Sequence, residues 1–269
     1  MSPADGRAVK GAFPFRIGIT SRSGARGESL AATFERWRWR VDDFFVHPRD
    51  GEPPLDDGEV ARLAALGRES LASFTVGVPQ GLRLASPDDA ARRRDAALVA
   101  DAVERARPID PRCYVLALDP PPAAGAEDAW RTAAAASIEE IVARTGVPPG
   151  FFAIENGAYD FAVAEKLLGR FGLSACTDVG ELYLHGHDIP GHLVRNLFRS
   201  RTVHLHMGLD GCVHVPLTAI PVDHLVGFLS FLFQRHYQSV VTIEVESEED
   251  VEASLKALER AWDRLRQER

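Results

Sequence analysis

Eight short apolar segments alternate along the chain with segments whose apolar residues recur at helical spacing. Regular alternation with short connections is typical of parallel sheets, and eight repeats favour a closed barrel. An open, doubly wound sheet remains an alternative, although no GxGxxG or Walker-type loop follows the first segment. The sequence therefore predicts one α/β domain, a single (β/α)8 TIM barrel. The predicted strands are residues 15–20, 41–46, 73–78, 113–119, 151–155, 174–178, 202–207 and 240–245.

The length and composition agree with one barrel, because 269 residues of which 45% are hydrophobic can bury a full core. We expect a flexible leader over residues 1–13 and the barrel domain over residues 14–269. The net charge of −8 argues against a surface that binds long nucleic acids, so the expected partner is a small molecule. No apolar run has membrane-spanning length, and the first residues contain no signal-peptide core.

The three cysteines, Cys113, Cys176 and Cys212, form no CxxC pair. Two of them lie in predicted strands, where a free thiol behaves as a small apolar residue. We therefore expect reduced thiols, two of them in the core, in a cytoplasmic protein.

Three acidic residues and a histidine lie at the ends of four predicted strands: Glu155, Asp178, His206 and Glu244. The carboxyl ends of barrel strands share one mouth, so these side chains can converge there. Carboxylates with one imidazole suit a single divalent ion, Mn²⁺ first, with Zn²⁺, Co²⁺ or Mg²⁺ as alternatives. Each acid could instead cap the following helix or pair with a loop arginine.

Histidines and an arginine near these strand ends are further candidates. His204 and His206 are two residues apart on a strand and therefore face the same side. We expect His206, nearer the mouth, to bind the ion, and His204 to lie one layer deeper. His214 could transfer a proton or contact a phosphate. Arg83 precedes a predicted helix from Ser86 to about residue 107, and it could clamp an anion or cover the barrel rim.

The strings FAIEN, CTDVGE, HLHMG and TIEVES resemble the xylose-isomerase-like barrel superfamily, which includes sugar isomerases, epimerases and endonuclease IV-type enzymes. Within it, VPQGLRLASPDDAARRRDAAL, ARPIDPRCYVLALD and VESEEDVEASLKAL are most similar to the cobamide-remodelling phosphodiesterases. The likeness covers nearly the whole chain after the leader. It implies the same four metal ligands, Glu155, Asp178, His206 and Glu244.

The chain departs from this pattern at three positions. Metal-rich relatives have histidines near the ends of strands three and four and shortly after the sixth-strand aspartate. Here those positions hold Gly77, Ala117 and Glu181. The departures predict one ion in place of a multinuclear zinc cluster, and they argue against an endonuclease.

The resemblance implies a metal-dependent hydrolase that acts on a phosphodiester in the nucleotide loop of cobamides, in corrinoid salvage. In this hypothesis Glu181 orients or deprotonates a water, and His214 protonates the leaving oxygen. Four other residues are expected to contact the substrate: Arg83, Asn156, Tyr159 and His204.

Two alternatives remain. One is a divalent-metal sugar isomerase or epimerase in which Glu155 and Glu244 move protons at an enediolate. The sequence MGLDGCV after His206 lacks the arginine with which such epimerases hold the sugar, which argues against it. The other is a catalytically inactive barrel that binds a corrinoid without cleaving it.

Overall fold

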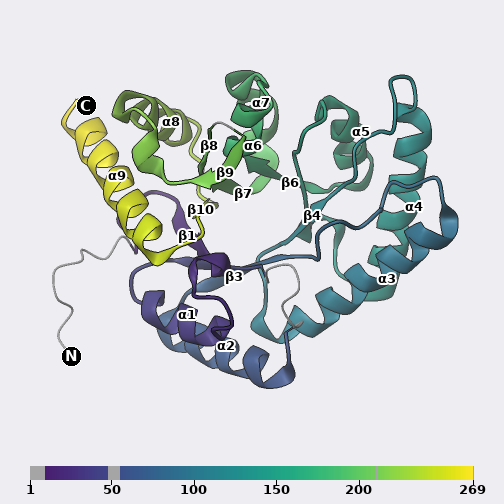
Figure 1. Cartoon of the computed structure of the whole chain (residues 1–269), viewed down its shortest axis with the longest axis horizontal. Coiled ribbons are helices and arrows are strands. Elements are labelled where there is room, and N and C mark those ends of the chain that lie inside the picture. Colours follow the sequence, from purple (N-terminus) through teal and green to yellow (C-terminus); the bar gives the residue numbers. More distant parts are fainter. Residues whose placement is uncertain (1–9, 48–54, 210, 269) are drawn as a thin grey trace.

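Eight parallel strands close into a barrel in the computed structural model, which describes residues 10–47, 55–209 and 211–268 (Figure 1). Closure confirms the predicted barrel and excludes the open sheet. The order around the ring is β1-β10-β7-β6-β5-β4-β3-β2. The strands are β1 (Arg16–Thr20), β2 (Asp43–Val46), β3 (Ser73–Gly77), β4 (Tyr114–Ala117), β5 (Phe152–Glu155), β6 (Ser174–Asp178), β7 (Ser200–Leu205) and β10 (Val240–Ile243).

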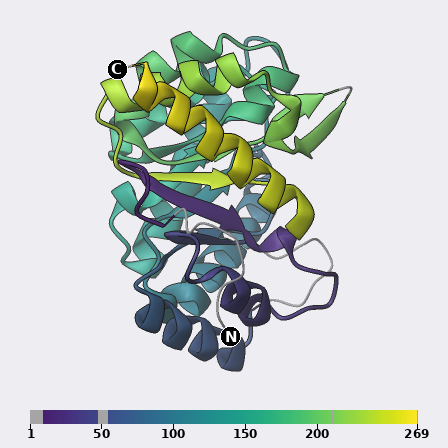
Figure 2. The ribbon, with the colours of Figure 1, turned by 90° about the vertical axis from the view of Figure 1, so that its left-hand side faces the viewer.

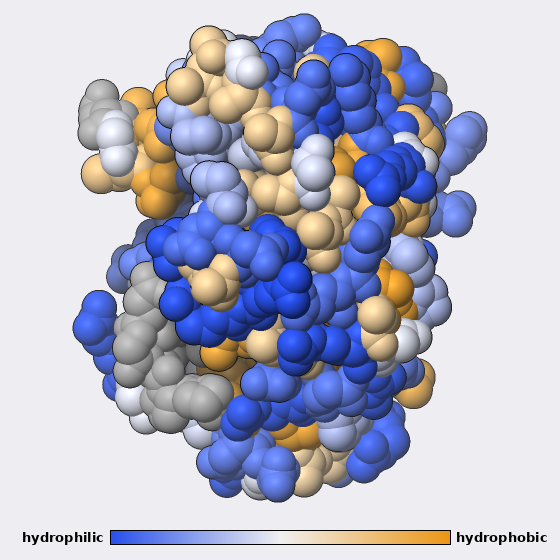
Figure 3. Space-filling view, turned by 90° about the vertical axis from the view of Figure 1, so that its right-hand side faces the viewer, coloured by the Kyte–Doolittle hydropathy of each residue, from blue (hydrophilic) through white to orange (hydrophobic). Residues whose placement is uncertain are grey.

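The helices of the described residues surround this ring, and α9 runs across the outside of β1 and β10 (Figure 2). The face over α3, α4 and α5 is mainly hydrophilic, as expected of helices that contact solvent (Figure 3). The helices are α1 (Leu30–Trp37), α2 (Asp57–Ser70), α3 (Asp89–Ala106), α4 (Glu127–Thr145), α5 (Ala162–Phe171), α6 (Val179–Leu184), α7 (Ile189–Asn196), α8 (Val222–Gln234) and α9 (Glu248–Gln267). Short 3-10 helices are η1 (Ser21–Ser23), η2 (Arg107–Ile109), η3 (Pro149–Phe151), η4 (Leu197–Arg199) and η5 (Leu217–Ala219).

Strand β2 illustrates why the strands are apolar on both faces. Phe44 points outward, and its ring centroid lies 5.0 Å from that of Phe34 in α1. Phe45 points inward and joins a small interior cluster with Cys113, Val115, Ala153 and Cys176. Alternate residues of one strand therefore enter two cores, one inside the barrel and one between the barrel and the helices. The two buried cysteines confirm the expectation that two thiols fill the core.

The first described residues pack against the barrel. Phe13 is buried, with its ring centroid 5.4 Å from those of Phe15 and Trp262. The backbone N–H of Gly11 donates to the carboxylate of Asp42. Residues 1–9 of the predicted leader lie outside the described residues. None of the helices in the described part of the chain combines the length and apolar character that crossing a bilayer requires.

Two local features differ from the sequence predictions. Helix α3 starts at Asp89 because Asp88, and not Ser86, accepts the backbone N–H groups of Ala90 and Ala91. Ser86 accepts the N–H of Asp88 instead and shapes the preceding turn. After β7 the chain forms an antiparallel hairpin, β8 (Met207–Leu209) and β9 (Cys212–Val215), which is absent from the strands that the sequence predicts. Figure 2 shows this hairpin projecting at the carboxyl ends of the barrel strands.

Candidate metal centre

The four predicted metal ligands come from four consecutive strands of the ring. Glu155 ends β5, Asp178 ends β6, His206 follows β7, and Glu244 follows β10. The register pairs Asp178 with His204, so the end of β6 lies beside the last residues of β7. All of these side chains therefore lie at the carboxyl-terminal mouth, which is where barrel enzymes build their sites.

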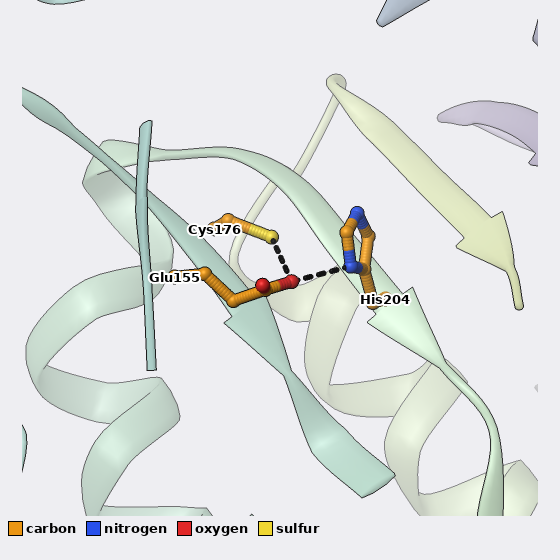
Figure 4. Close-up of side chains that lie close together, drawn as sticks. All are labelled: Glu155, Cys176 and His204. Atoms are coloured by element: carbon orange, nitrogen blue, oxygen red, sulfur yellow. Dashed lines mark hydrogen bonds and ion pairs between the residues drawn. The ribbon is translucent and has the colours of Figure 1, made fainter. Parts of the chain in front are cut away.

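His204 lies at the centre of the acidic groups. Its Nδ1 atom is 2.8 Å from Oε1 of Glu155, 3.0 Å from Oε2 of Glu244 and 3.9 Å from Oδ2 of Asp178. Figure 4 shows Glu155 and His204 pointing toward one another from neighbouring parts of the barrel, with Cys176 beside them. The thiol of Cys176 donates to Oε1 of Glu155 at 3.5 Å. The prediction of His204 as a deeper residue did not anticipate contacts with two carboxylates.

His206 lies on the other side of Asp178. Its Nε2 atom is 3.0 Å from Oδ1 of Asp178, and its ring is almost completely buried. Its Nδ1 atom is 3.3 Å from the carbonyl of Met207 and 3.1 Å from the backbone N–H of His214. The His214 N–H donates to Nδ1, so the neutral ring carries its proton on Nε2, toward Asp178. Nε2 could bind a cation only in the other tautomer, in which Nδ1 donates to the Met207 carbonyl and the bond from His214 is lost. The ring fits because residue 180 is glycine: a Cβ there would be 2.0 Å from it.

His214 reaches the centre from the hairpin that the sequence did not predict. Its Nε2 atom is 3.7 Å from Oε1 of Glu244, and its ring centroid is 4.8 Å from that of His206. Its backbone adopts a left-handed conformation with φ of 61°. Strain of this kind persists when the surrounding contacts hold it in place. The structure thus brings His214 to the predicted ligands.

These residues form three overlapping groups whose potential ligand atoms lie within 4.8 Å of one another: Glu155, Cys176 and His204; Asp178, His204 and Glu244; and His206, His214 and Glu244. The buried carboxylates carry negative charge that burial makes costly without a compensating cation. Both ring nitrogens of His204 are buried without a hydrogen bond, although two carboxylates are close to Nδ1. Oxygen and imidazole donors are the ligands that divalent ions use, so each group fits a metal, but none of the three contains all four predicted ligands.

The pKa values of the cluster also indicate a site that attracts positive charge. Burial raises the pKa of Glu155. Burial would raise that of Glu244 too, but His204 holds the pKa of Glu244 far below its ordinary value. Burial would lower the pKa of His206, but Asp178 raises it to about 9. In the absence of a metal, protons on the imidazoles therefore balance the acids, and metal binding would displace protons.

Two of the residues expected to contact substrate lie next to the cluster. Asn156 is buried, and its side-chain amide donates to the carbonyl of Asp178 while its oxygen accepts the N–H of Asp178. It therefore positions the end of β6. Tyr159 has a buried hydroxyl without a hydrogen bond, and burial raises its pKa above the ordinary value. Its ring packs against Trp130, with centroids 5.6 Å apart.

Outside the three ligand groups lie two more predicted residues: Glu181, which we expected to act on the water, and Arg83, which we expected to contact the substrate. Glu181 is in the first turn of α6, and its Oε2 atom is 3.1 Å from Nε2 of His185. Its backbone N–H donates to Oδ1 of Asp178, so Asp178 also caps α6. Arg83 lies in the loop between β3 and α3 with a side chain 52% exposed, and its Nε atom is 3.9 Å from Asp95.

Two residues that the sequence analysis did not select lie near the centre. Arg22 follows β1, and its Nη2 atom is 3.5 Å from Oε1 of Glu246. His47 follows β2 and is buried, with Nδ1 lacking a hydrogen-bond partner. A Cβ at Gly77 would be 3.0 Å from Cγ of His47, so the glycine leaves room for this imidazole. His47 directly follows a predicted strand and Arg22 lies two residues after one, so a search just beyond the strand ends could have identified them.

An apolar cavity of about 750 Å³ lies between α6, α7, α8 and the hairpin, and His206 forms part of its wall. Its polar lining includes Asp223 and His224, whereas apolar residues such as Tyr183, Leu205 and Phe228 form most of it. This volume is within the range of small-molecule sites.

Residues 40–266 match the family described as "Xylose isomerase-like TIM barrel". The chain belongs to this family. This membership confirms the superfamily resemblance that the strand-end motifs indicated.

Solved structures with the same fold cover nearly the whole chain. A D-tagatose 3-epimerase-like protein has a TM-score of 0.74 and 18% identity, covering 94% of this chain and 99% of its own. Endonuclease IV from Thermus thermophilus has a TM-score of 0.69 and 18% identity, with 93% and 99% covered. The IolI protein, solved with a zinc atom, has a TM-score of 0.69 and 13% identity, with 93% and 98% covered. At these identities the likeness shows the fold alone. A comparison with curated proteins finds no match.

Proposed function

We propose that this protein is a divalent-metal-dependent phosphodiesterase that hydrolyses the nucleotide loop of cobamides. The observation that carries this proposal is the position of Glu155, Asp178, His206 and Glu244 at the carboxyl ends of four consecutive strands. They belong to three overlapping groups of potential ligands that His204 and Glu244 link, and an apolar cavity lies beside His206. The convergence supports metal chemistry, and the cavity supports a substrate with a large apolar part. The sequence resemblance supplies the cobamide as the specific substrate.

Glu155, Asp178, His206 and Glu244 would hold the ion, Mn²⁺ first, with His204 beneath them. When bound, a divalent cation supplies charge stabilisation at the phosphoryl group and acidifies a water. The chain's own residues shape that site. Asn156 fixes the end of β6, so the Asp178 carboxylate points toward His206. The hydrogen bonds of Asp178 with the start of α6 restrict its remaining freedom.

Hydrolysis adds one water across a P–O bond, and the leaving oxygen must gain a proton. We assign this proton transfer to His214, whose imidazole is nearly buried and lies 3.7 Å from Glu244. Burial lowers the pKa of His214, so its imidazole would first accept the proton that the attacking water gives up and then pass it to the leaving oxygen. Glu181 remains our proposed group for orienting the water, and its contact with His185 would then have to open.

Two features favour a corrinoid over a sugar. The segment after His206, where an epimerase would need its sugar-binding arginine, is the hairpin of β8 and β9, which exposes Leu209 and Val213. The neighbouring cavity is lined mainly by apolar side chains. A cobamide has apolar ring surfaces that such walls can cover, whereas a free sugar needs hydrogen bonds.

The test is chromatography of a cobamide incubated with the Mn²⁺-loaded protein. We expect the cobamide to be split into a corrinoid without its base and a nucleoside-containing product, and we expect Glu155→Gln to abolish this activity. Glu139→Gln, an exposed residue paired with Arg170 on the helical surface, is the matched control and should retain activity. An intact cobamide after incubation with wild-type protein would refute the hydrolase. If that intact cobamide also comigrates with the protein, the protein is a corrinoid-binding barrel that does not cleave its ligand.

One specific observation favours a second candidate, a sugar isomerase or epimerase. Glu155 and Glu244 approach the same atom of His204 from two sides, and proton transfer on both faces of an enediolate needs two such carboxylates. Epimerisation of a ketose by the Mn²⁺-loaded protein, with no cobamide cleavage, would establish this candidate.

A further inference from the structure

The two halves of the barrel mouth differ in charge. In the ring order, β1 lies four strands from β5, and β2 lies four strands from β6. Arg22 and His47, which follow β1 and β2, therefore lie across the mouth from Glu155 and Asp178. The acidic half holds the candidate metal ligands, and the opposite half offers a guanidinium and an imidazole.

The residues of the basic half are fixed by hydrogen bonds between two strand ends. The Ser21 hydroxyl donates to the carbonyl of His47 at 2.9 Å and accepts its N–H at 2.8 Å. The N–H of Arg22 donates to the hydroxyl of Thr20 at 3.2 Å. The loop after β1 is thus tied to the end of β2, which places Arg22 and His47 side by side before any ligand binds. Such preorganisation lowers the entropic cost of binding.

The environment of His47 connects the basic half with the metal centre. Burial lowers the pKa of His47 to about 4, so the imidazole is neutral at pH 7 and can donate one hydrogen bond. Glu244, Arg22 and His214 are close enough to act on it electrostatically. Its Nδ1 atom is buried without a partner, and such a group needs a ligand or water to satisfy it.

Glu246 is one partner of Arg22 and of His214. Its Oε1 atom lies 3.5 Å from Nη2 of Arg22 and 3.4 Å from Nδ1 of His214. The Glu246 side chain is 56% exposed, whereas those of Arg22 and His214 are 17% and 14% exposed. An exposed surface carboxylate therefore bridges two nearly buried donors, in the way that an oxyanion could.

We propose that Arg22, His47 and His214 form an oxyanion subsite that holds the non-bridging oxygens of a phosphoryl group, and that Glu246 occupies it between ligands. Arg22 and His47 approach from across the mouth, opposite Glu155 and Asp178, whereas His214 lies beside Glu244. The planar guanidinium of Arg22 suits two oxygens of a tetrahedral anion. This proposal depends on the proposed function only for the identity of the anion, because the same donors could bind the phosphoryl group of other ligands.

Calorimetric titration of the Mn²⁺-loaded protein with inorganic phosphate, and separately with dimethyl phosphate, tests the subsite without requiring turnover. Arg22→Gln should weaken phosphate binding about tenfold or more, because it removes a charge-assisted hydrogen bond. His47→Phe should weaken it by a smaller factor. Glu246→Gln should strengthen it several-fold, because the competing carboxylate is gone. Arg26→Gln, exposed in the same loop, is the matched control and should change nothing.

Opposite effects of Arg22→Gln and Glu246→Gln on phosphate affinity would distinguish binding from a merely structural role. The Mn²⁺ content of each variant would show whether the metal centre is intact. Phosphate affinity unchanged in Arg22→Gln, or no phosphate binding to the wild-type protein, would overturn the subsite. Phosphate binding that follows the predicted order without cobamide cleavage would support the subsite and contradict the proposed function. Preference for dimethyl phosphate over inorganic phosphate would identify the anion as a diester.

Discussion

At the scale of single residues, the interior of the barrel contains an ionisable side chain, Asp43, that is fully buried. Asp43 points inward from β2 with no exposed surface, and the hydroxyl of Ser73 donates to its Oδ2 atom. Its Oδ1 atom has no hydrogen-bond partner. Burial raises the pKa of Asp43 to about 6, above the ordinary value of 3.8. The folded protein therefore holds a proton on Asp43 that the unfolded chain releases at lower pH.

This shift predicts a pH dependence of stability. Because the folded-state pKa of Asp43 is raised, its contribution to the unfolding free energy is complete below pH 4 and decreases as the pH rises through 6, by up to about 3 kcal/mol. Asp43→Asn carries no ionisable group and should lack this decrease, so variant and wild type should diverge between pH 4 and 7. Urea denaturation across this range checks it, with exposed Asp101→Asn as the control. Parallel curves for Asp43→Asn and wild type would contradict the burial argument.

At the scale of elements, the close approach of α6 to the end of β7 builds the metal centre. Helix α6 begins immediately after Asp178, which is both its N-cap and a candidate ligand. Gly180 in its first turn contacts the ring of His206, and the carbonyl of Gly180 would be 2.9 Å from a Cβ at Gly208. Glycines on both sides therefore let the helix, the strand end and the hairpin pack without side chains between them.

Gly180→Ala should displace the His206 ring, since the added Cβ would lie 2.0 Å from it. We expect a loss of Mn²⁺ affinity of about tenfold or more, with a destabilisation of about 1–3 kcal/mol from overpacking. Gly169→Ala in α5 is the matched control, because its Cβ would meet no atom within 4 Å and alanine favours a helix. Calorimetric Mn²⁺ titration and urea denaturation measure both effects. Unchanged Mn²⁺ affinity in Gly180→Ala would show that His206 does not bind the ion.

The sequence predicted elements better than their ends. Apolar periodicity located all eight barrel strands, because burial on both faces leaves a continuous apolar signal. It misplaced the start of α3, because Ser86 and Asp88 are both good caps and only the turn geometry selects Asp88. It missed the β8–β9 hairpin, whose three- and four-residue strands are too short to show alternation. That hairpin carries His214, so the sequence pointed to the residue without the element that carries it.

At the scale of the whole molecule, barrel closure is what turns distant sequence motifs into one site. Motifs at Glu155 and Glu244 are far apart in the chain, yet β5, β6, β7 and β10 are consecutive in the ring. Strand ends were therefore a sound guide to Glu155, Asp178 and Glu244. The positions of the strand ends could not decide whether His204 or His206 would bind the ion. That choice depends on how deep each side chain lies and on the space that Gly180 leaves. The division of the mouth into acidic and basic halves likewise follows only from strand order.

We propose that one divalent ion is shared by the strand-end ligands Glu155, Asp178, His206 and Glu244. The most direct test is a Mn²⁺ titration of chelator-treated protein, followed by electron paramagnetic resonance. The account predicts one tightly bound Mn²⁺ per chain in the wild-type protein and in Glu139→Gln, and none in Glu155→Gln with its circular dichroism spectrum intact. Wild-type protein that leaves all the Mn²⁺ free in solution, or Glu155→Gln that binds it as tightly as wild type, would contradict the account.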